Sequence, residues 1–172
     1  MKTNTIELYI HIPFCKSKCK YCDFCSFRAE EETIHAYLGK LKEELIFWGK
    51  KLAARDVVTV FIGGGTPSYL RREDIQMICE TIFEHFHICE DAEITIEANP
   101  GTVDLKKLCT YRENGINRIS FGLQSTVKEE LEYLGRIHTY EEFLQKMQGL
   151  GVRTVIVTDF YKVSTGQDKL DF

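Results

Sequence analysis

The chain has 172 residues, of which 44% are hydrophobic and 28% charged, and its formal net charge is −4. This composition is typical of a folded globular protein, and the dispersed basic residues argue against nucleic acid or an anionic membrane as the main partner. No stretch reaches the roughly 20 apolar residues that span a bilayer, and residues 1–14 lack the apolar run of a signal peptide. Seven cysteines without a secretion signal predict a cytoplasmic chain whose thiols bind metal.

Apolar patterning predicts strands and helices in alternation. Runs of apolar and β-branched residues predict strands at 6–12, 57–63, 93–99, 117–123 and 153–159. Helical periodicity predicts helices at 30–52, 71–87, 103–113 and 140–149. This alternation predicts an α/β domain with a parallel sheet and right-handed connections.

The prolines and the glycine run follow predicted strands. Pro13, Pro67 and Pro100 each come directly after one, and so do the three glycines at 63–65. Sites of β/α proteins form at the carboxyl ends of their strands, so these turns are the predicted location of the site. The whole chain is predicted to be one domain with a polar tail after Tyr161.

Four cysteines stand close together in HIPFCKSKCKYCDFCSF, residues 11–27: Cys15, Cys19, Cys22 and Cys25. Free thiols are disfavoured, because clustered exposed thiols oxidise. Structural zinc held by the first three cysteines with Cys25 or His11 is an alternative, although zinc sites usually draw two ligand pairs from separate turns. Three thiolates on one loop can instead hold a [4Fe–4S] cluster by three irons, which leaves the fourth iron for an outside ligand.

A second motif is the glycine-rich segment FIGGGTPSYL, residues 61–70. Glycines after a strand let the backbone approach a ligand and expose N–H and C=O groups to it. A tight strand-to-helix turn is the simpler interpretation of the same letters. A phosphate-binding P-loop is excluded, because no lysine follows the glycines.

Polar residues near the ends of later strands are further candidates. Glu97 in EITIEANPGT and Gln124 in RISFGLQS either bind a ligand or pair within the fold, since an unpaired polar group at an apolar strand is costly. Arg136 in LGRIHTYEEF is a candidate partner for a carboxylate. His138, in the same segment, is predicted to be a surface histidine.

Together these motifs resemble the radical S-adenosylmethionine (SAM) superfamily. The spacing C-x3-C-x2-C, with Tyr21 before its last cysteine, resembles the cluster motif, and GGGTPS resembles the segment that receives the methionine amino group of SAM. The resemblance implies that Cys15, Cys19 and Cys22 ligate a [4Fe–4S] cluster. It further implies that SAM chelates the open iron and is cleaved to methionine and a 5′-deoxyadenosyl radical. The implied fold is a partial parallel (β/α) barrel.

Within that superfamily, YIHIPFCKSKCKYCDF, EITIEANPGT, NRISFGLQS and LGRIH resemble the oxygen-independent coproporphyrinogen III oxidases, and especially their HemW-like haem chaperone branch. The resemblance runs from about Leu8 to Glu142. It implies a SAM site lined by Tyr9, Gly64, Gly65, Thr66, Glu97, Gln124 and Arg136, with Asp159 at the end of the fifth strand as an additional candidate. It also implies an electron donor, and haem or a haem-accepting protein as partners.

Two departures from the family pattern shape the functional prediction. The oxidase branch has a cysteine where this chain has Phe24, and Cys25 stands one residue late, so Cys25 is not an expected ligand. This favours haem chaperoning over coproporphyrinogen oxidation. Family members also continue past Phe172 with a sixth strand and a carboxyl-terminal domain. We therefore expect the amino-terminal part of a radical SAM core domain, incomplete after about five strands and prone to associate.

Two classes of function follow. The first is a [4Fe–4S] and SAM-binding protein linked to porphyrin (haem) biosynthesis or haem delivery, with turnover left open by the missing segments. The second is a non-catalytic metal- or haem-binding protein that keeps the cysteine loop as a structural zinc or iron–sulfur element, or an inactive remnant.

Overall fold

The computed structural model describes residues 4–149. They fall into two compact units, one ending at Gly122 and the other beginning at Leu123. None of the helices within the described range is long and apolar enough to cross a bilayer.

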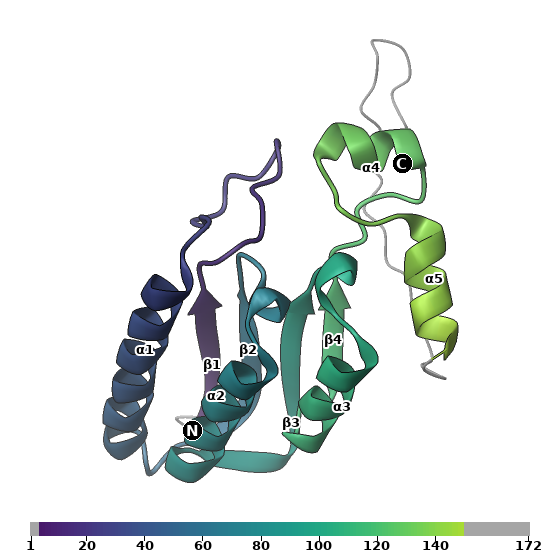
Figure 1. Cartoon of the computed structure of the whole chain (residues 1–172). Helices are drawn as coiled ribbons and strands as arrows, with labels where there is room; N and C mark the ends of the chain where they lie inside the picture. The colour runs from purple at the N-terminus through teal and green to yellow at the C-terminus, as the bar shows by residue number, and fades with distance from the viewer. Residues whose placement is uncertain (1–3, 150–172) are drawn as a thin grey trace, which may run out of the picture. The chain divides into compact units, whose positions relative to one another are not determined.

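The first unit is a parallel sheet covered by helices on one face (Figure 1). Its strands are β1 (Thr5–Ile12), β2 (Asp56–Gly64), β3 (His87–Ala98) and β4 (Arg118–Phe121), and they lie in the order β1-β2-β3-β4. Its helices are α1 (Glu31–Lys51), α2 (Arg72–His85) and α3 (Leu105–Glu113), with the short 3-10 turns η1 (Pro67–Tyr69) and η2 (Pro100–Thr102) after β2 and β3. Sequential order with parallel pairing means that every connection crosses the same face of the sheet.

The core lies between this sheet and its helices. It includes Ile10, Ile12, Val60, Ile62, Ile94 and Ile96 from the strands, and Leu38, Leu45, Ile75, Ile78 and Ile82 from the helices. Alternate strand residues point to the opposite face. There the rings of Tyr9 and Phe61 stack with their centroids 6.1 Å apart, and Tyr9 is 59% exposed.

The four strands and four helices predicted within the described range are confirmed as elements, with changes in their bounds. The predicted helix 71–87 ends at His85, and β3 begins at His87 rather than at 93. This early start is stabilised by pairing with the beginning of β2, where Asp56 lies opposite His87 and their side chains are 2.8 Å apart. The predicted fifth strand, Asp159 and the tail after Tyr161 lie outside the described residues.

The second unit contains α4 (Lys128–Leu134), which the sequence did not predict, and α5 (Tyr140–Gly149). Gly135 ends α4 in the left-handed conformation (φ 75°). The prediction that His138 lies on the surface is wrong. His138 is buried, and its Nε2 is bonded to the carbonyl of Leu123 at 3.2 Å.

Two buried ionisable side chains make the stability of the core depend on pH. Burial raises the pKa of the Cys79 thiol from 9.0 to about 12, and burial also raises the pKa of Tyr111 above its ordinary value. The Tyr111 hydroxyl has no hydrogen-bond partner among the described residues. Both groups therefore keep their protons in the folded chain at pH values where the unfolded chain loses them.

We expect the free energy of unfolding to fall as pH rises above about 9, by up to about 1.4 kcal/mol per pH unit for the Cys79 proton alone. The loss continues towards the folded pKa of about 12, and Tyr111 adds to it above about 10. Cys79→Ala should flatten the fall between about pH 9 and 10, measured by urea unfolding under reducing conditions. Ile78→Val, a neighbouring buried change without a thiol, should shift the whole curve and keep its slope. An equal slope in Cys79→Ala and wild type would contradict this assignment.

Candidate functional site

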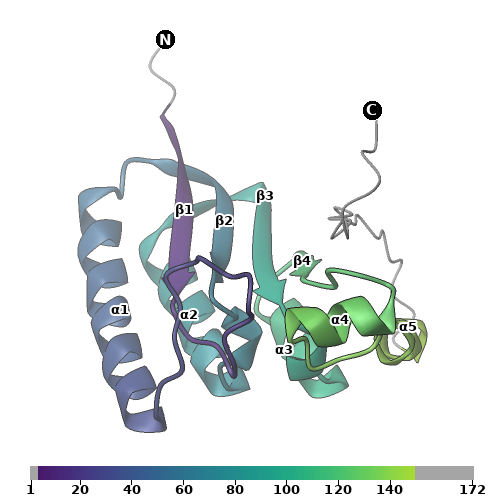
Figure 2. The same cartoon turned by 90° about the horizontal axis from the view of Figure 1, so that it is seen from above.

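The cysteine loop, residues 13–30, joins β1 to α1 above the carboxyl ends of β1 and β2 (Figure 2). Its base is closed by a parallel bridge between Phe14 and Phe27. The Cys15 N–H donates to the Phe27 carbonyl at 3.0 Å, and the Phe27 N–H donates to the Pro13 carbonyl at 2.9 Å. The bridge buries Cys15, while Cys19 and Cys22 are half-buried.

Lys18 stabilises the cysteine loop through hydrogen bonds to two of its carbonyls. Lys18 Nζ donates to the carbonyls of Phe24 (3.1 Å) and Ser26 (3.2 Å). The Cys22 N–H donates to the Cys19 carbonyl at 3.2 Å.

The three thiols of Cys15, Cys19 and Cys22 provide ligands of the kind that an iron–sulfur cluster takes. A [4Fe–4S] cube takes each thiolate on a different iron, so its ligands stand apart. Soft thiolates are also the ligands that such clusters select. The donor set of Cys15, Cys19 and Cys22 therefore fits the cluster.

The glycine segment is bonded directly to the base of the cysteine loop. The Gly65 N–H donates to the Ile12 carbonyl and the Thr66 N–H donates to the Phe14 carbonyl, both at 2.8 Å. A Cβ at Gly65 would lie 2.8 Å from the Phe14 oxygen and 3.0 Å from Cys15 Sγ. Only glycine allows this close approach, so the two motifs form one structure.

Glu97 reaches the same place from the end of β3. Its Oε2 accepts the Gly64 N–H at 2.9 Å, and Gly64 adopts φ +116°. The half-buried carboxylate thus pairs with a backbone donor of the glycine segment. Its negative charge, after the larger effect of burial, also raises the pKa of Tyr9.

His11 links β1 to the far side of the cysteine loop. Its Nε2 lies 3.1 Å from the Cys25 carbonyl, which can only accept, so Nε2 donates and the ring is assigned the Nε2–H tautomer. Its Nδ1 then accepts from the Tyr9 hydroxyl at 3.0 Å. The Tyr37 hydroxyl donates to the His11 carbonyl at 2.5 Å. Both ring nitrogens of His11 are therefore engaged in hydrogen bonds within the fold.

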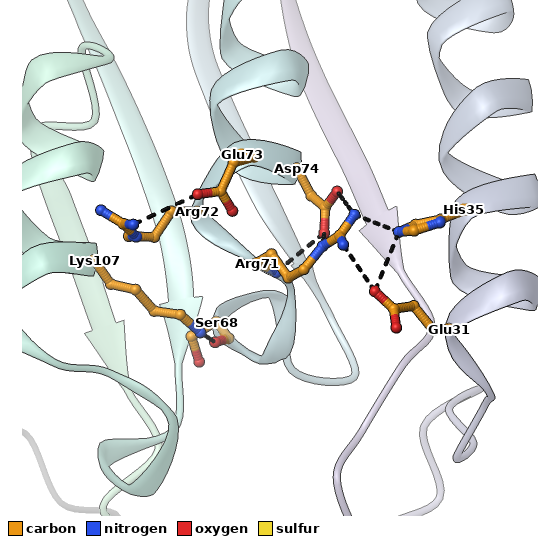
Figure 3. Close-up of polar contacts among 8 residues, drawn as sticks. All are labelled: Glu31, His35, Ser68, Arg71, Arg72, Glu73, Asp74 and Lys107. Atoms are coloured by element: carbon orange, nitrogen blue, oxygen red, sulfur yellow. Dashed lines mark hydrogen bonds and ion pairs between the residues drawn. The ribbon is translucent and has the colours of Figure 1, made fainter.

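Two charged anchors hold the turns that carry the site (Figure 3). Arg71, just before α2, donates to Glu31 (2.7 Å) and Asp74 (3.2 Å) and contacts His35. Because α1 begins at Glu31, this contact connects the end of the cysteine loop to the end of the glycine segment. Arg71 is half exposed, so the contact fixes geometry more than it adds stability.

The second anchor is Lys107 of α3. Its Nζ donates to the Ser68 carbonyl at 2.5 Å (Figure 3) and to the Thr102 carbonyl at 3.0 Å, which joins η1 to η2. Burial lowers the pKa of Lys107. The Ser68 hydroxyl completes the link, since it accepts the Asn99 N–H at 2.9 Å.

The structure brings together part of the predicted site. Gly64, Gly65, Thr66 and Glu97 lie with Cys15 and the base of the cysteine loop at the carboxyl ends of β1, β2 and β3, and Tyr9 lies within β1, where its hydroxyl bonds to His11. Sequence reasoning gave no role to Lys18, Ser26, Tyr37, Arg71 or Lys107, because no motif marks them.

Two other predicted residues, Gln124 and Arg136, belong to the second unit. Gln124 adopts a left-handed conformation (φ 72°), which is rare for a side-chain-bearing residue and typical of functional sites. Arg136 lines a hollow of about 240 Å³ with Lys128, Glu132, His138 and Glu142 among its other walls.

The family model described as "Radical SAM superfamily" matches residues 9–171. This chain therefore belongs to the radical SAM superfamily. Membership implies a [4Fe–4S] cluster and SAM, for which the cysteine loop and the glycine segment provide the groups described above.

Within the superfamily the chain is similar to proteins named HemW and HemN. It is 42% identical over 158 residues to "Heme chaperone HemW" of Escherichia coli (strain K12), covering 90% of this chain and 42% of the relative. It is 38% identical over 135 residues to the protein of the same name from Bacillus subtilis (strain 168), covering 78% and 36%.

A solved structure is similar to this chain as well. Coproporphyrinogen III oxidase (HemN) from Escherichia coli, itself described as a radical SAM enzyme, superposes with a TM-score of 0.80 at 31% identity, covering 87% of this chain and 35% of that chain. The predicted family and the partial parallel barrel are confirmed. The chain spans about two fifths of the length of the curated relatives named above.

Proposed function

We propose that this chain binds a [4Fe–4S] cluster through Cys15, Cys19 and Cys22 and SAM beside it, as the amino-terminal part of a radical SAM core domain. The observation that carries this proposal is the bonding between the two motifs. Gly65 and Thr66 donate their N–H groups to Ile12 and Phe14, on the chain that leads into Cys15. A ligand bound by the glycine segment would therefore lie against the cysteine loop.

The chain's own groups would bind and orient SAM. Backbone groups of Gly64, Gly65 and Thr66 would receive its methionine amino group, and Glu97 and Tyr9 would border it. The family resemblance adds Gln124, Arg136 and Asp159 as further candidates for binding SAM. When bound, the cluster supplies the electron that cleaves SAM. The protein's part is to hold the cofactor and to limit access of water.

We further propose a role in haem delivery or porphyrin metabolism in the cytoplasm, with an electron donor and haem or a haem-accepting protein as partners. The relatives named heme chaperone support haem delivery over coproporphyrinogen oxidation. So does Phe24, which is 70% exposed and stands where the oxidase branch has a further cysteine.

The test is anaerobic reconstitution of the full chain with iron and sulfide, followed by electron paramagnetic resonance of the reduced protein with and without SAM. The expected result is a [4Fe–4S] signal that changes when SAM is added, because SAM occupies the open iron. Tight stoichiometric zinc with no cluster would overturn the proposal and favour a structural metal loop. Formation of 5′-deoxyadenosine then measures whether the chain turns over.

A further inference from the structure

The side chain of Thr66 contacts a cysteine of the cysteine loop, which the glycine-rich motif alone does not predict. Its hydroxyl Oγ1 donates to Cys15 Sγ at 3.4 Å, within hydrogen-bond range for a sulfur acceptor. The side chain that follows the glycines thus points at a cluster ligand. Its backbone N–H meanwhile donates to the Phe14 carbonyl at 2.8 Å, so Thr66 is held at two points beside Cys15.

The surroundings favour a strong effect of this bond. Cys15 is the buried member of the cysteine loop, while Cys19 and Cys22 are half-buried and Cys25 is exposed. Water competes least for the sulfur of Cys15, and a hydrogen bond in a low-dielectric setting is electrostatically stronger than the same bond in water. A Cβ at Gly65 would lie 3.0 Å from Cys15 Sγ, so the glycine leaves room beside this sulfur.

We propose that Thr66 is a positioning residue that raises the reduction potential of the cluster through its O–H···S bond to the Cys15 thiolate. This inference rests on the proposed function, since it requires the cluster. One-electron reduction adds a negative charge that spreads over the cluster and its thiolates. A hydrogen-bond donor on a ligand sulfur stabilises the more negative state, and hydrogen bonds to sulfur are among the factors that set cluster potentials.

A second hydroxyl lies at the same place. Ser26 is buried, and its Oγ has no hydrogen-bond partner among the described residues. Its Cβ lies 3.0 Å from the point where a Gly65 Cβ would stand, and that point is also 3.0 Å from Cys15 Sγ. A buried hydroxyl without a partner is costly, and a cluster sulfur would supply the missing acceptor. Ser26 therefore places a second hydroxyl-bearing side chain beside Cys15, next to the bonded Thr66.

The experiment is a redox titration of the reconstituted full chain without SAM, with dithionite as the one-electron reductant and the reduced signal as readout. Thr66→Val keeps the shape of the side chain and removes the hydroxyl. It is expected to lower the reduction potential of the cluster by about 59 mV, which is about a tenfold change in the equilibrium constant for one-electron reduction. Thr66→Ser should restore the wild-type potential. Thr81→Val is the matched control, because Thr81 is buried in α2 and donates to the Met77 carbonyl.

The outcomes separate this inference from the proposed function. A wild-type chain that assembles no cluster contradicts the proposed function itself. A Thr66→Val cluster with unchanged potential overturns the inference, and loss of the SAM response alone would assign the hydroxyl to SAM. Failure of Thr66→Val and Thr66→Ala to assemble a cluster, while Thr66→Ser does, supports the role of the hydroxyl. Failure of Thr66→Ser as well overturns it.

Discussion

Gly64→Ala is expected to lower the free energy of unfolding by about 2–3 kcal/mol and to remove the SAM-dependent change in the cluster signal. Gly64 has φ +116°, a conformation that side-chain-bearing residues rarely adopt. An added Cβ would lie 2.6 Å from two ring atoms of His11 and 3.1 Å from the Ile12 carbonyl oxygen. The substitution therefore combines backbone strain with overlap at the centre of the site.

Urea unfolding gives the stability change, provided that the slope with denaturant stays constant. Gly39→Ala is the matched control, because Gly39 lies within α1 and its added Cβ meets nothing within 4 Å. That control should gain about 0.5–1 kcal/mol from the lower flexibility of alanine. A Gly64→Ala chain that unfolds at the wild-type midpoint would show that the turn relaxes freely.

The double variant His11→Ala/Gly64→Ala separates the two causes. Removing the His11 ring eliminates the overlap with that ring but leaves the backbone strain and the contact with the Ile12 carbonyl oxygen, so the double variant should be more stable than the sum of the single effects predicts. Additive effects would assign the whole loss to backbone strain and the Ile12 contact.

Most of the fold was predictable because each element buries a periodic apolar face. Helix α1 is expected at 30–52 and found at Glu31–Lys51, since Ile34, Leu38 and Leu45 recur on one side and pack into the core. The first half of β3 lacks such a signal. Residues 87–91 are mostly polar or half-buried, and they become a strand through pairing with the start of β2. Only the assembled sheet provides that stabilisation.

The site likewise has residues that the sequence predicts and supporting contacts that it does not. The family resemblance predicted Tyr9, whereas Glu97 and the glycine segment were candidates because they stand near the ends of strands whose order along the chain matches their order in the sheet. The contacts that hold the site in place join segments far apart in the sequence, and no local sequence pattern marks them. Arg71 meets Glu31, 40 residues earlier, and Lys107 meets Ser68, 39 residues earlier. Their partners are set by packing of helices on the sheet, which one-dimensional spacing does not encode.

Cys19→Ala is expected to abolish the cluster, whereas Cys25→Ala should retain it. Removing one of three thiolates leaves a second iron without a protein ligand, and the cube then has two anchors on a loop that is partly exposed. Cys25 differs because its connection to the fold uses its backbone. The Cys25 carbonyl accepts from His11 Nε2 at 3.1 Å, and alanine keeps that carbonyl.

Iron and sulfide content per chain, together with the reduced electron paramagnetic resonance signal, measures the outcome after identical reconstitution. Cys109→Ala is the matched control for loss of an exposed cysteine, since Cys109 lies in α3, outside the cysteine loop. Retention of a full cluster in Cys19→Ala would refute the three-ligand assignment. Loss of the cluster in Cys25→Ala alone would make Cys25 a ligand, and the loop would then have to turn its most exposed thiol inward and break the contact between His11 and the Cys25 carbonyl.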